Sequence, residues 1–465
     1  MKTAIGLEIH VQLKTKSKMF CGCDNFAVGK KENTLICPVC LGYPGVLPVP
    51  NKEAVLMTVK TGLALDCKIN HQTHFDRKHY FYPDLPKNYQ ISQYSQPIAE
   101  KGKFKIWVDS KTKTVRIKRV HLEEDAAKLV HSPTAALVDF NRSGTPLMEI
   151  VTEPDIETPE EARAFLQQLR AVLVELGVSN ADLEKGEMRC DANVSVSKTD
   201  KLGTPVEIKN MNSYRAVYQA LSFEIERLSL LVEKGEKIKK ETRGWDETKK
   251  QTLPQRTKET APDYRYFPEP DIPPIVFTAK EIAKIKAEIP TLPFERRKKL
   301  IQKYQLPKDQ ASILALEPVL GQLFEDLTQE GIKAKTVANF LTGPVVEKIK
   351  LGLDPAQINF LAILKILKAF DKREITNLSA KEIFEKSLIA PEKTERLIKK
   401  ATVTADSGTL EELAKKIVKE NPQAVSDFKK GKNQALGFLI GQAMQKTQGK
   451  IDPIAFRKVL KKLLK

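Results

Sequence analysis

The sequence changes character near residue 290, and this change limits the possible folds more than any other feature. Before this point, short segments of alternating polarity are separated by frequent Pro and Gly, and all six histidines occur there. After it, segments such as LEPVLGQLFEDL and NFLAILKILKAF space their apolar residues as one face of a helix requires. We therefore predict an α+β protein, with a mixed α/β part built on a largely antiparallel sheet, followed by all-helical domains.

The length predicts more than one domain. A chain of 465 residues is too long for one compact core, so about three domains are expected. We place them at residues 1–292, 293–400 and 401–465. Residues 234–274 show little apolar periodicity and many prolines, which predicts a loop. No apolar run approaches the roughly 18 residues of a membrane span, and the N-terminus MKTAIGLEIH lacks a signal-peptide core, so we expect a cytoplasmic protein without membrane contact.

The charge balance predicts a polyanionic partner. The net charge is +18, and an excess on this scale attracts phosphates and releases their counterions. From residue 428 onward, ten Lys or Arg stand against one Asp, a net of +9 and half of the total. A solvated basic face on a helical domain would explain the same count equally well.

Acidic side chains gather on the polar faces of predicted strands. In IGLEIHVQL the alternation puts Glu8 and His10 on one face, and in VHLEEDAAK it puts Glu123 at a strand end beside Glu124. Together with Glu149 in PLMEIVTEPD they suit Mg²⁺, which also binds water and substrate phosphates. Solvated or salt-bridged acids are the alternative. No G-x-x-x-x-G-K-[ST] motif occurs, so any nucleoside triphosphate is bound without a P-loop.

Two junctions carry residues that suit phosphate or nucleotide binding. The segment NRSGT supplies Asn141, Arg142, Ser143 and Thr145, a cation with small hydrogen-bond donors. A predicted strand-to-helix junction, where helix amides favour an anion, supplies Lys209, Asn210, Asn212, Ser213 and Arg215. A turn between strands would explain the first group, and helix capping alone would explain Asn212 or Ser213.

Two helices are marked by their ends. Thr158-Pro159-Glu160-Glu161 reads as a capping box with Pro at the first helical position, and the helix should stop at Gly177. A second helix should begin near Ser213 and stop before Gly235. Both are predicted to pack over the sheet.

Four of the six cysteines form two close pairs. Cys21-x-Cys23 and Cys37-x-x-Cys40 are separated by a loop of thirteen residues. In a reducing compartment, clustered cysteines bind metals or do redox chemistry more often than they form disulfides. Four thiolates around zinc leave no open position, which predicts a structural zinc site. Unliganded thiols are the alternative, because the first pair has only one intervening residue.

Long motifs in this sequence resemble the B subunit of the glutamyl-tRNA(Gln)/aspartyl-tRNA(Asn) amidotransferases, the GatB family. In order they are GLEIHVQL, CPVCLGYPGVLPVPN, RKHYFYPDLPKNYQISQY, HLEEDAAK, DFNRSGTPLMEIVTEPD, EKGEMRCDANVSV, EIKNMNSYRAV and DYRYFPEPDIPP. The stretch NPQAVSDFKKGKNQALGFLIGQAMQKTQGKIDP resembles the tail domain that these subunits share with small YqeY-type proteins. The resemblance covers essentially the whole chain.

The resemblance implies an ATP-dependent carbon–nitrogen ligase acting on charged tRNA. An amidase A subunit and a small C subunit would complete a heterotrimer, and this chain would cradle the acceptor end of Glu-tRNA(Gln) or Asp-tRNA(Asn). ATP would phosphorylate the side-chain carboxylate, and ammonia from a tunnel would displace phosphate. A zinc-containing RNA-binding protein without catalysis and a stand-alone metal-dependent phosphohydrolase are the rival classes.

The resemblance also assigns residues. Glu8, His10, Glu123 and Glu149 fall at the family's Mg²⁺ site, although sequence alone does not separate the role of Glu123 from that of its neighbour Glu124. The tail residues expected to meet tRNA phosphates are Lys429, Lys430, Lys432, Lys446 and Lys450. Tyr80, Tyr82, Lys87 and Tyr89 line either the acceptor-end pocket or the ammonia path, or pack on a partner.

Overall fold

The computed structural model describes residues 1–132, 134–257, 263–402, 407–447 and 451–464. The chain divides into two units, Met1–Arg296 and Arg297–Lys465. All strands of the described residues lie in the first unit and the second is helical, which confirms the α+β prediction. The boundaries at residues 292/293 and 400/401 stay predictions.

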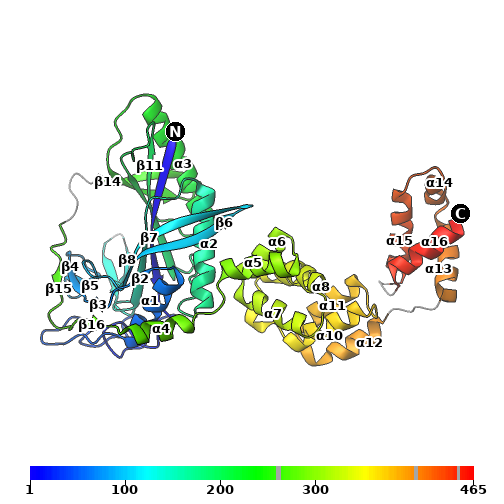
Figure 1. Cartoon of the computed structure of the whole chain (residues 1–465), viewed down its shortest axis with the longest axis horizontal. Helices are drawn as coiled ribbons and strands as arrows, with labels where there is room; N and C mark the ends of the chain where they lie inside the picture. Colours follow the sequence, from blue (N-terminus) through cyan, green and yellow to red (C-terminus); the bar gives the residue numbers. More distant parts are fainter. Residues whose placement is uncertain (133, 258–262, 403–406, 448–450, 465) are drawn as a thin grey trace. The chain divides into compact units, whose positions relative to one another are not determined.

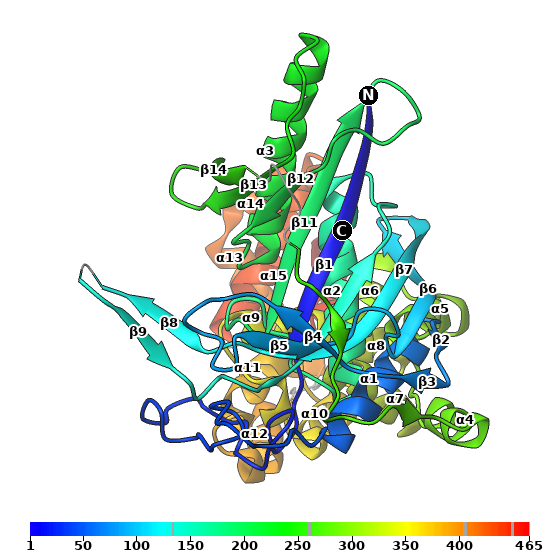
Figure 2. The same cartoon turned by 90° about the vertical axis from the view of Figure 1, so that its left-hand side faces the viewer.

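A nine-stranded sheet organises the first unit (Figures 1 and 2). Its strands, in spatial order, are β14 (Gln251–Thr257), β13 (Glu241–Asp246), β12 (Val206–Lys209), β11 (Met188–Ser197), β1 (Lys2–Gln12), β10 (Pro146–Thr152), β7 (Lys111–Glu124), β6 (Ala99–Val108) and β2 (Lys68–Ile69). Every neighbouring pair is antiparallel except β12 with β13. The sheet is therefore largely antiparallel, as predicted.

The alternation of buried and partly exposed residues along β1 determines which face of the sheet carries the candidate functional side chains. Ile5, Leu7 and Ile9 are fully buried in the core, whereas His10 and its neighbours on the other face remain partly exposed. Helices α1 (Lys52–Ala64), α2 (Pro159–Glu175) and α3 (Tyr214–Glu233) pack with the apolar face. The opposite, polar face is left for the site.

The ends of α2 and α3 follow the predicted signals. The Thr158 side chain accepts a hydrogen bond from the N–H of Glu161, and the Ser213 side chain accepts one from the N–H of Ala216. Gly177 follows the end of α2 in the left-handed region at φ 69°, which a residue without Cβ adopts at no steric cost. Both helices begin where the sequence signals predict.

The predicted loop at residues 234–274 is wrong in part. It contains β13 and β14, which extend the main sheet. Apart from Trp245, their buried side chains are polar: Thr242, Arg243 and Thr252 are buried, and the last two meet the fully buried carboxylate of Glu224 on α3. Because these strands bury hydrogen-bonded polar groups, they show no apolar alternation from which they could be recognised.

Smaller sheets border the polar face. They comprise β15 (Phe267–Pro268), β4 (Asp76–His79) and β5 (Tyr89–Ser92) in one, β3 (Gln72–Thr73) and β16 (Ile275–Val276) in another, and β8 (Lys128–His131) with β9 (Ala136–Asp139) as a hairpin. Figure 2 shows this hairpin projecting from the sheet. Helix α4 (Ala279–Ala287) packs on α1.

The second unit is built from helices around two separate hydrophobic clusters. The helices are α5 (Pro293–Tyr304, beginning in the first unit), α6 (Lys308–Leu316), α7 (Pro318–Gln329), α8 (Ala334–Phe340), η1 (Leu341–Val345), α9 (Val346–Lys350), η2 (Pro355–Gln357), α10 (Phe360–Asp371), α11 (Asn377–Ser387), η3 (Pro391–Lys393), α12 (Thr394–Ala401), α13 (Ser407–Glu420), α14 (Pro422–Lys429), α15 (Gln434–Lys446) and α16 (Pro453–Leu464). One cluster spans residues 300–384 and the other residues 410–464. Within the described ranges, no helix combines the length and apolar character needed to cross a membrane.

Candidate functional site

On the polar face of the sheet, side chains from the three neighbouring strands β1, β10 and β7 lie in one row across the strands. In the register of β1 with β10, His10 lies opposite Glu149, and in that of β10 with β7, Glu149 lies opposite His121. Directly opposed residues on one face of an antiparallel pair interact closely. Glu123 is two residues beyond His121 on the same strand, so its side chain joins this row.

The row converges on a small volume. His10 Nε2 lies 3.6 Å from Glu123 Oε1 and 3.7 Å from Glu149 Oε2. The ligand atoms of these three residues all lie within 4.8 Å of one another. Two carboxylates and one imidazole form a donor set that fits a hard divalent cation and leaves positions for water and phosphate. Of the four predicted Mg²⁺ ligands, the structure brings His10, Glu123 and Glu149 together.

Glu8 lies next to this group but outside it. Its Oε1 accepts a hydrogen bond of 3.0 Å from Asn193 Nδ2, and its Cα is paired with that of Asp191 on β11. Burial raises the pKa of Glu8, and the carboxylates of Glu149, Glu207 and Asp191 raise it further. Its role as a direct ligand stays a prediction.

His121 is a buried partner of these ligands to which the sequence interpretation gives no role. Its Nε2 lies 2.9 Å from Glu149 Oε2 and 3.7 Å from Glu123 Oε2, and the residue is 2% exposed. Burial lowers the pKa of His121, but the charge of Glu149 and the hydrogen bonds to both carboxylates outweigh this effect and the pKa is raised. The alternation in VHLEED places His121 on the face of Glu123, so the signal is present in the sequence.

The two carboxylates are held in their ionised form. Burial acts to raise the pKa of Glu123, but the His121 hydrogen bond and the Lys78 charge lower it to about 2. Burial likewise opposes ionisation of Glu149, whose pKa is nevertheless lowered by the charge of His121. Ser92 Oγ donates a further hydrogen bond of 3.0 Å to Glu123. Ionised carboxylates are the form that binds a metal cation.

A cleft of about 390 Å³ opens over this row. Besides His10 and Glu123, its lining includes Lys78, Tyr80, Asp125, Arg142, Arg189, Asp191, Lys209, Asn210 and Asn212. Several of the cations are fixed by acids: Arg189 donates to Asp125 at 2.7 Å, and Lys209 is paired with Asp191. Cationic walls around a carboxylate cluster suit a phosphate chain that carries a metal ion.

The predicted phosphate-binding residues divide into two groups. Arg142, Lys209, Asn210 and Asn212 line the cleft. Asn141 and Ser143 are buried, and their side-chain hydrogen bonds go to Leu35, Lys31 and Cys40 in the preceding loop. Thr145 is buried, Ser213 caps α3, and Arg215 is exposed. For Asn141, Ser143 and Ser213, support of the local backbone accounts for the side-chain contacts.

The four clustered cysteines meet in space. The Sγ atoms of Cys21, Cys23, Cys37 and Cys40 lie within 4.8 Å of one another. Hydrogen bonding from the Cys21 thiol lowers the pKa of Cys40 to about 5, with further contributions from the Cys37 N–H and the Lys18 charge. Four convergent sulfur atoms are the donor set of a closed tetrahedral zinc site.

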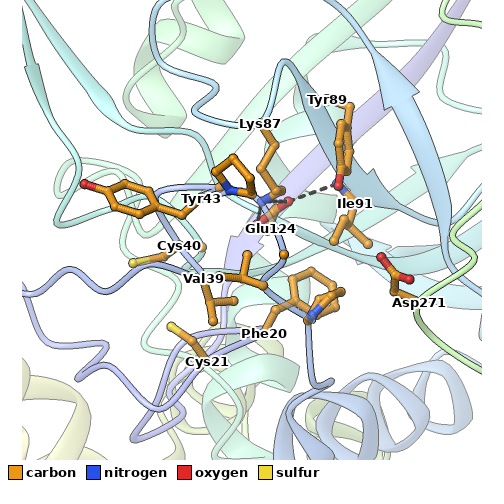
Figure 3. Close-up of a pocket in the computed structure, with 16 residues that line it drawn as sticks. Phe20, Cys21, Val39, Cys40, Tyr43, Lys87, Tyr89, Ile91, Glu124 and Asp271 are labelled. Carbon is orange, nitrogen blue, oxygen red and sulfur yellow. Dashed lines mark hydrogen bonds and ion pairs between the residues drawn. The ribbon is translucent and has the colours of Figure 1, made fainter.

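A pocket of about 250 Å³ is lined by Cys21 and Cys40 of this cluster and by Glu124 at the end of β7. Figure 3 shows the side chains that line it. Glu124 is one of its lining residues: Lys87 Nζ lies 2.8 Å from Glu124 Oε2, and the Ile91 N–H donates to Oε1 at 3.0 Å. Glu123 and Glu124 are consecutive on a strand and point to opposite faces. The carboxylate of Glu124 is thus engaged in this pocket, whereas Glu123 belongs to the cleft.

Three of the predicted tail lysines gather at one place. Lys429 ends α14, and Lys430 and Lys432 follow it, all three exposed. Lys432 Nζ lies 3.1 Å from Asp427, and Lys446 at the end of α15 is paired with Glu420. Lys450 lies outside the described residues.

Comparison with known proteins identifies relatives along the whole chain. Residues 3–283 match the family model described as the GatB/GatE catalytic domain, and residues 322–464 match that described as the GatB domain. The B subunit of the aspartyl/glutamyl-tRNA(Asn/Gln) amidotransferase of Thermotoga maritima is 44% identical over 476 residues, which cover 100% of this chain and 99% of the relative. The B subunits of the same name in Thermotoga neapolitana and Carboxydothermus hydrogenoformans are 45% and 44% identical over 476 and 472 residues, covering 100% and 99% of this chain and 99% and 98% of each relative.

Proposed function

This chain belongs to the GatB family, the B subunits of aspartyl/glutamyl-tRNA(Asn/Gln) amidotransferases, and we propose that it amidates the amino acid of Glu-tRNA(Gln) or Asp-tRNA(Asn). The products are Gln-tRNA(Gln) and Asn-tRNA(Asn). An amidase A subunit hydrolyses glutamine to supply ammonia, and a small C subunit completes the heterotrimer. As a translation enzyme, the protein works in the cytoplasm.

The chemistry requires two steps. A carboxylate is a poor acyl donor because its oxygen leaves badly, so a carboxylate oxygen first attacks the γ-phosphorus of ATP and ADP leaves. Ammonia then attacks the acyl carbon of the mixed anhydride, the C–O bond breaks as inorganic phosphate leaves, and the nitrogen loses a proton. The enzyme must therefore hold a triphosphate, a carboxylate and ammonia together in one cleft.

The convergence of His10, Glu123 and Glu149 beneath a cation-lined cleft is the observation that carries this proposal. These residues would hold Mg²⁺, which when bound neutralises phosphate oxygens during phosphoryl transfer. Around them, Arg142, Arg189 and Lys209 place positive charge where the triphosphate must lie. The contact of 2.9 Å between His121 Nε2 and Glu149 Oε2 fixes the orientation of the Glu149 carboxylate.

Three further assignments complete the proposal. The four cysteines bind a structural zinc ion that fixes the loop after β1. We propose further that ammonia approaches the cleft through the pocket in Figure 3, which Lys87 and Glu124 line as an ion pair. Lys429, Lys430, Lys432, Lys446 and Lys450 contact phosphates of the tRNA and position it rather than select it.

The test is formation of Gln-tRNA(Gln) from Glu-tRNA(Gln) by this chain with A and C subunits, ATP, Mg²⁺ and glutamine. Glu123→Gln should abolish product formation, because it removes the negative charge of one of the three side chains that meet beneath the cleft. Glu226→Gln, on the exposed face of α3, is the matched control and should leave turnover unchanged. Near-normal turnover in the Glu123 variant would remove the metal-site assignment.

Two outcomes would favour the rival classes. ATP hydrolysis by this chain alone, independent of tRNA and of the other subunits, would indicate a phosphohydrolase. Tight tRNA binding with no product under any combination of subunits would indicate a binding protein without catalysis.

A further inference from the structure

Lys18 is a fully buried cation outside the cleft. Its exposed fraction is 0%, and it is among the largest completely buried side chains of the described residues. It lies between β1 and the first cysteine pair, where its backbone N–H donates to the carbonyl of Cys23 at 2.9 Å. The proposed reaction gives this lysine no role.

A buried ammonium group is costly unless an anion or several acceptors surround it. Lys18 Nζ contacts two acceptors, the carbonyl oxygen of Phe140 at 3.3 Å and Cys40 Sγ at 3.8 Å. No carboxylate forms an ion pair with Lys18 in the part of the chain that the structure describes. The thiolate of Cys40 is therefore the anionic group placed to balance its charge.

The cysteine cluster, when it binds a divalent metal, requires positive charge nearby. Four thiolates around one divalent cation carry two negative charges in excess, and this cluster is partly shielded from water. Such an excess is stabilised by nearby cations and by N–H donors. The Cys37 N–H supplies one donor to Cys40 Sγ at 3.1 Å, and Lys18 supplies a full positive charge.

The aliphatic part of the Lys18 side chain also packs against Gly144. A Cβ added at Gly144 would lie 3.6 Å from both Lys18 Cδ and Cys40 Cβ, so this glycine packs directly on the lysine stem and the cluster. The Gly144 carbonyl accepts from the Met19 N–H at 2.7 Å, and Ser143 Oγ donates to the Cys40 carbonyl at 3.2 Å. The 141–145 loop and the cysteine cluster thus enclose Lys18 between them.

We propose that Lys18 is the counter-cation of the four-cysteine metal site and, through Phe140, the tie between that site and the 141–145 loop. It is a positioning residue: it touches neither substrate nor reacting atoms, and it acts on the metal through Cys40. The inference rests on metal binding by the four cysteines, which is part of the proposed function, and is independent of the amidotransferase reaction.

The experiment measures metal affinity of the full chain, using Co²⁺ as a coloured substitute for Zn²⁺ in competition with a chelator. Lys18→Met keeps an apolar stem of similar length and removes the ammonium. We expect affinity to fall about tenfold or more, as for other partners of metal ligands. Lys16→Met, two residues earlier and exposed, is the control and should bind as tightly as the parent protein.

The absorption of bound Co²⁺ provides a readout that packing alone would not change. Loss of the positive charge beside Cys40 raises the energy of the sulfur electrons, so the sulfur-to-cobalt band should move to longer wavelength in Lys18→Met. The band comes from the loaded fraction only, and it remains informative if part of the variant misfolds. An unshifted band with unchanged affinity would overturn the proposal, as would a parent protein that takes up no metal at these cysteines.

Thermal unfolding compares the effect of the substitution on the metal-loaded protein with its effect on the metal-free protein. The Lys18→Met change should lower the midpoint of the metal-loaded protein more than that of the metal-free protein, because only the loaded site carries the excess negative charge of four thiolates beside the ammonium. An equal loss in both states would reduce Lys18 to a packing residue.

Discussion

At the scale of single residues, the unusual member of the site is His121. It is buried between two carboxylates, and its Nδ1 has no hydrogen-bond partner among the described residues. A cation there offsets the repulsion between Glu123 and Glu149 and fixes the orientation of Glu149. The residue is thus placed to preorganise the proposed metal ligands without occupying a ligand position.

We predict that His121→Gln weakens the use of Mg²⁺ by about 10–100-fold, the usual effect of losing a partner of a metal ligand. The measurement is the Mg²⁺ dependence of Gln-tRNA(Gln) formation, in which the half-saturating concentration should rise. His71→Gln is the control, because His71 is exposed just before β3 and its ring hydrogen-bonds to a backbone carbonyl. An unchanged Mg²⁺ dependence in the His121 variant would contradict the assignment.

At the scale of elements, β13 and β14 depend on one buried ionic network. Glu224 of α3 is fully buried, pairs with Arg227, lies 3.6 Å from Arg243 Nε, and accepts a hydrogen bond of 2.7 Å from Thr252 Oγ1. The network joins a helix on the apolar face to the edge of the sheet. Since Glu224, Arg243 and Thr252 are all buried, removal of Glu224 takes an anionic partner from Arg243 and a hydrogen-bond acceptor from Thr252.

Glu224→Ala should therefore destabilise the first unit by roughly 3 kcal/mol, near the lower end for breaking a buried pair, because Arg243 keeps Glu241 at 3.2 Å. The measurement is the free energy of unfolding in urea, followed by the fluorescence of the two tryptophans of the first unit, Trp107 on β6 and Trp245 on β13. Glu226→Ala, two residues along the same helix on its exposed face, should change it by less than about 0.5 kcal/mol. Equal effects of the two changes would show that the network contributes nothing.

At the scale of the whole molecule, charge is distributed unevenly between the parts. Carboxylates and cations both line the cleft, whereas the segment from residue 428 carries a net charge of +9. Its exposed Lys429, Lys430 and Lys432 lie together at the C-terminal end of α14. The tail thus offers a concentration of positive charge to a partner that carries many phosphates.

We predict that a chain ending near residue 400 binds tRNA more weakly, while glutamine hydrolysis by the A subunit persists. Binding is measured by titration at several salt concentrations, because lost phosphate contacts also flatten the salt dependence. As a smaller change, replacing Lys429, Lys430 and Lys432 by Gln should reduce both the affinity for tRNA and the slope of its salt dependence. Unchanged tRNA affinity after truncation would exclude the tail as a contact.

Several features of the molecule could be predicted without coordinates: the alternation that puts Glu8 and His10 on one face, the caps of α2 and α3, and the spacing of the cysteines. The alternation and the caps depend on residues within a few positions of one another, and the four cysteines all lie within one segment of twenty residues. The same reasoning misses β13 and β14, where buried polar groups replace the apolar pattern.

Which polar residues meet could be learned only from the folded sheet. His10 stands far from His121 and Glu149 in the chain, and the three share a row because β10 pairs with both β1 and β7 in one register. That register is set by burial of the apolar face along the whole sheet, which no local segment encodes. The same packing sends Glu123 to the cleft and Glu124 to Lys87 on the opposite side.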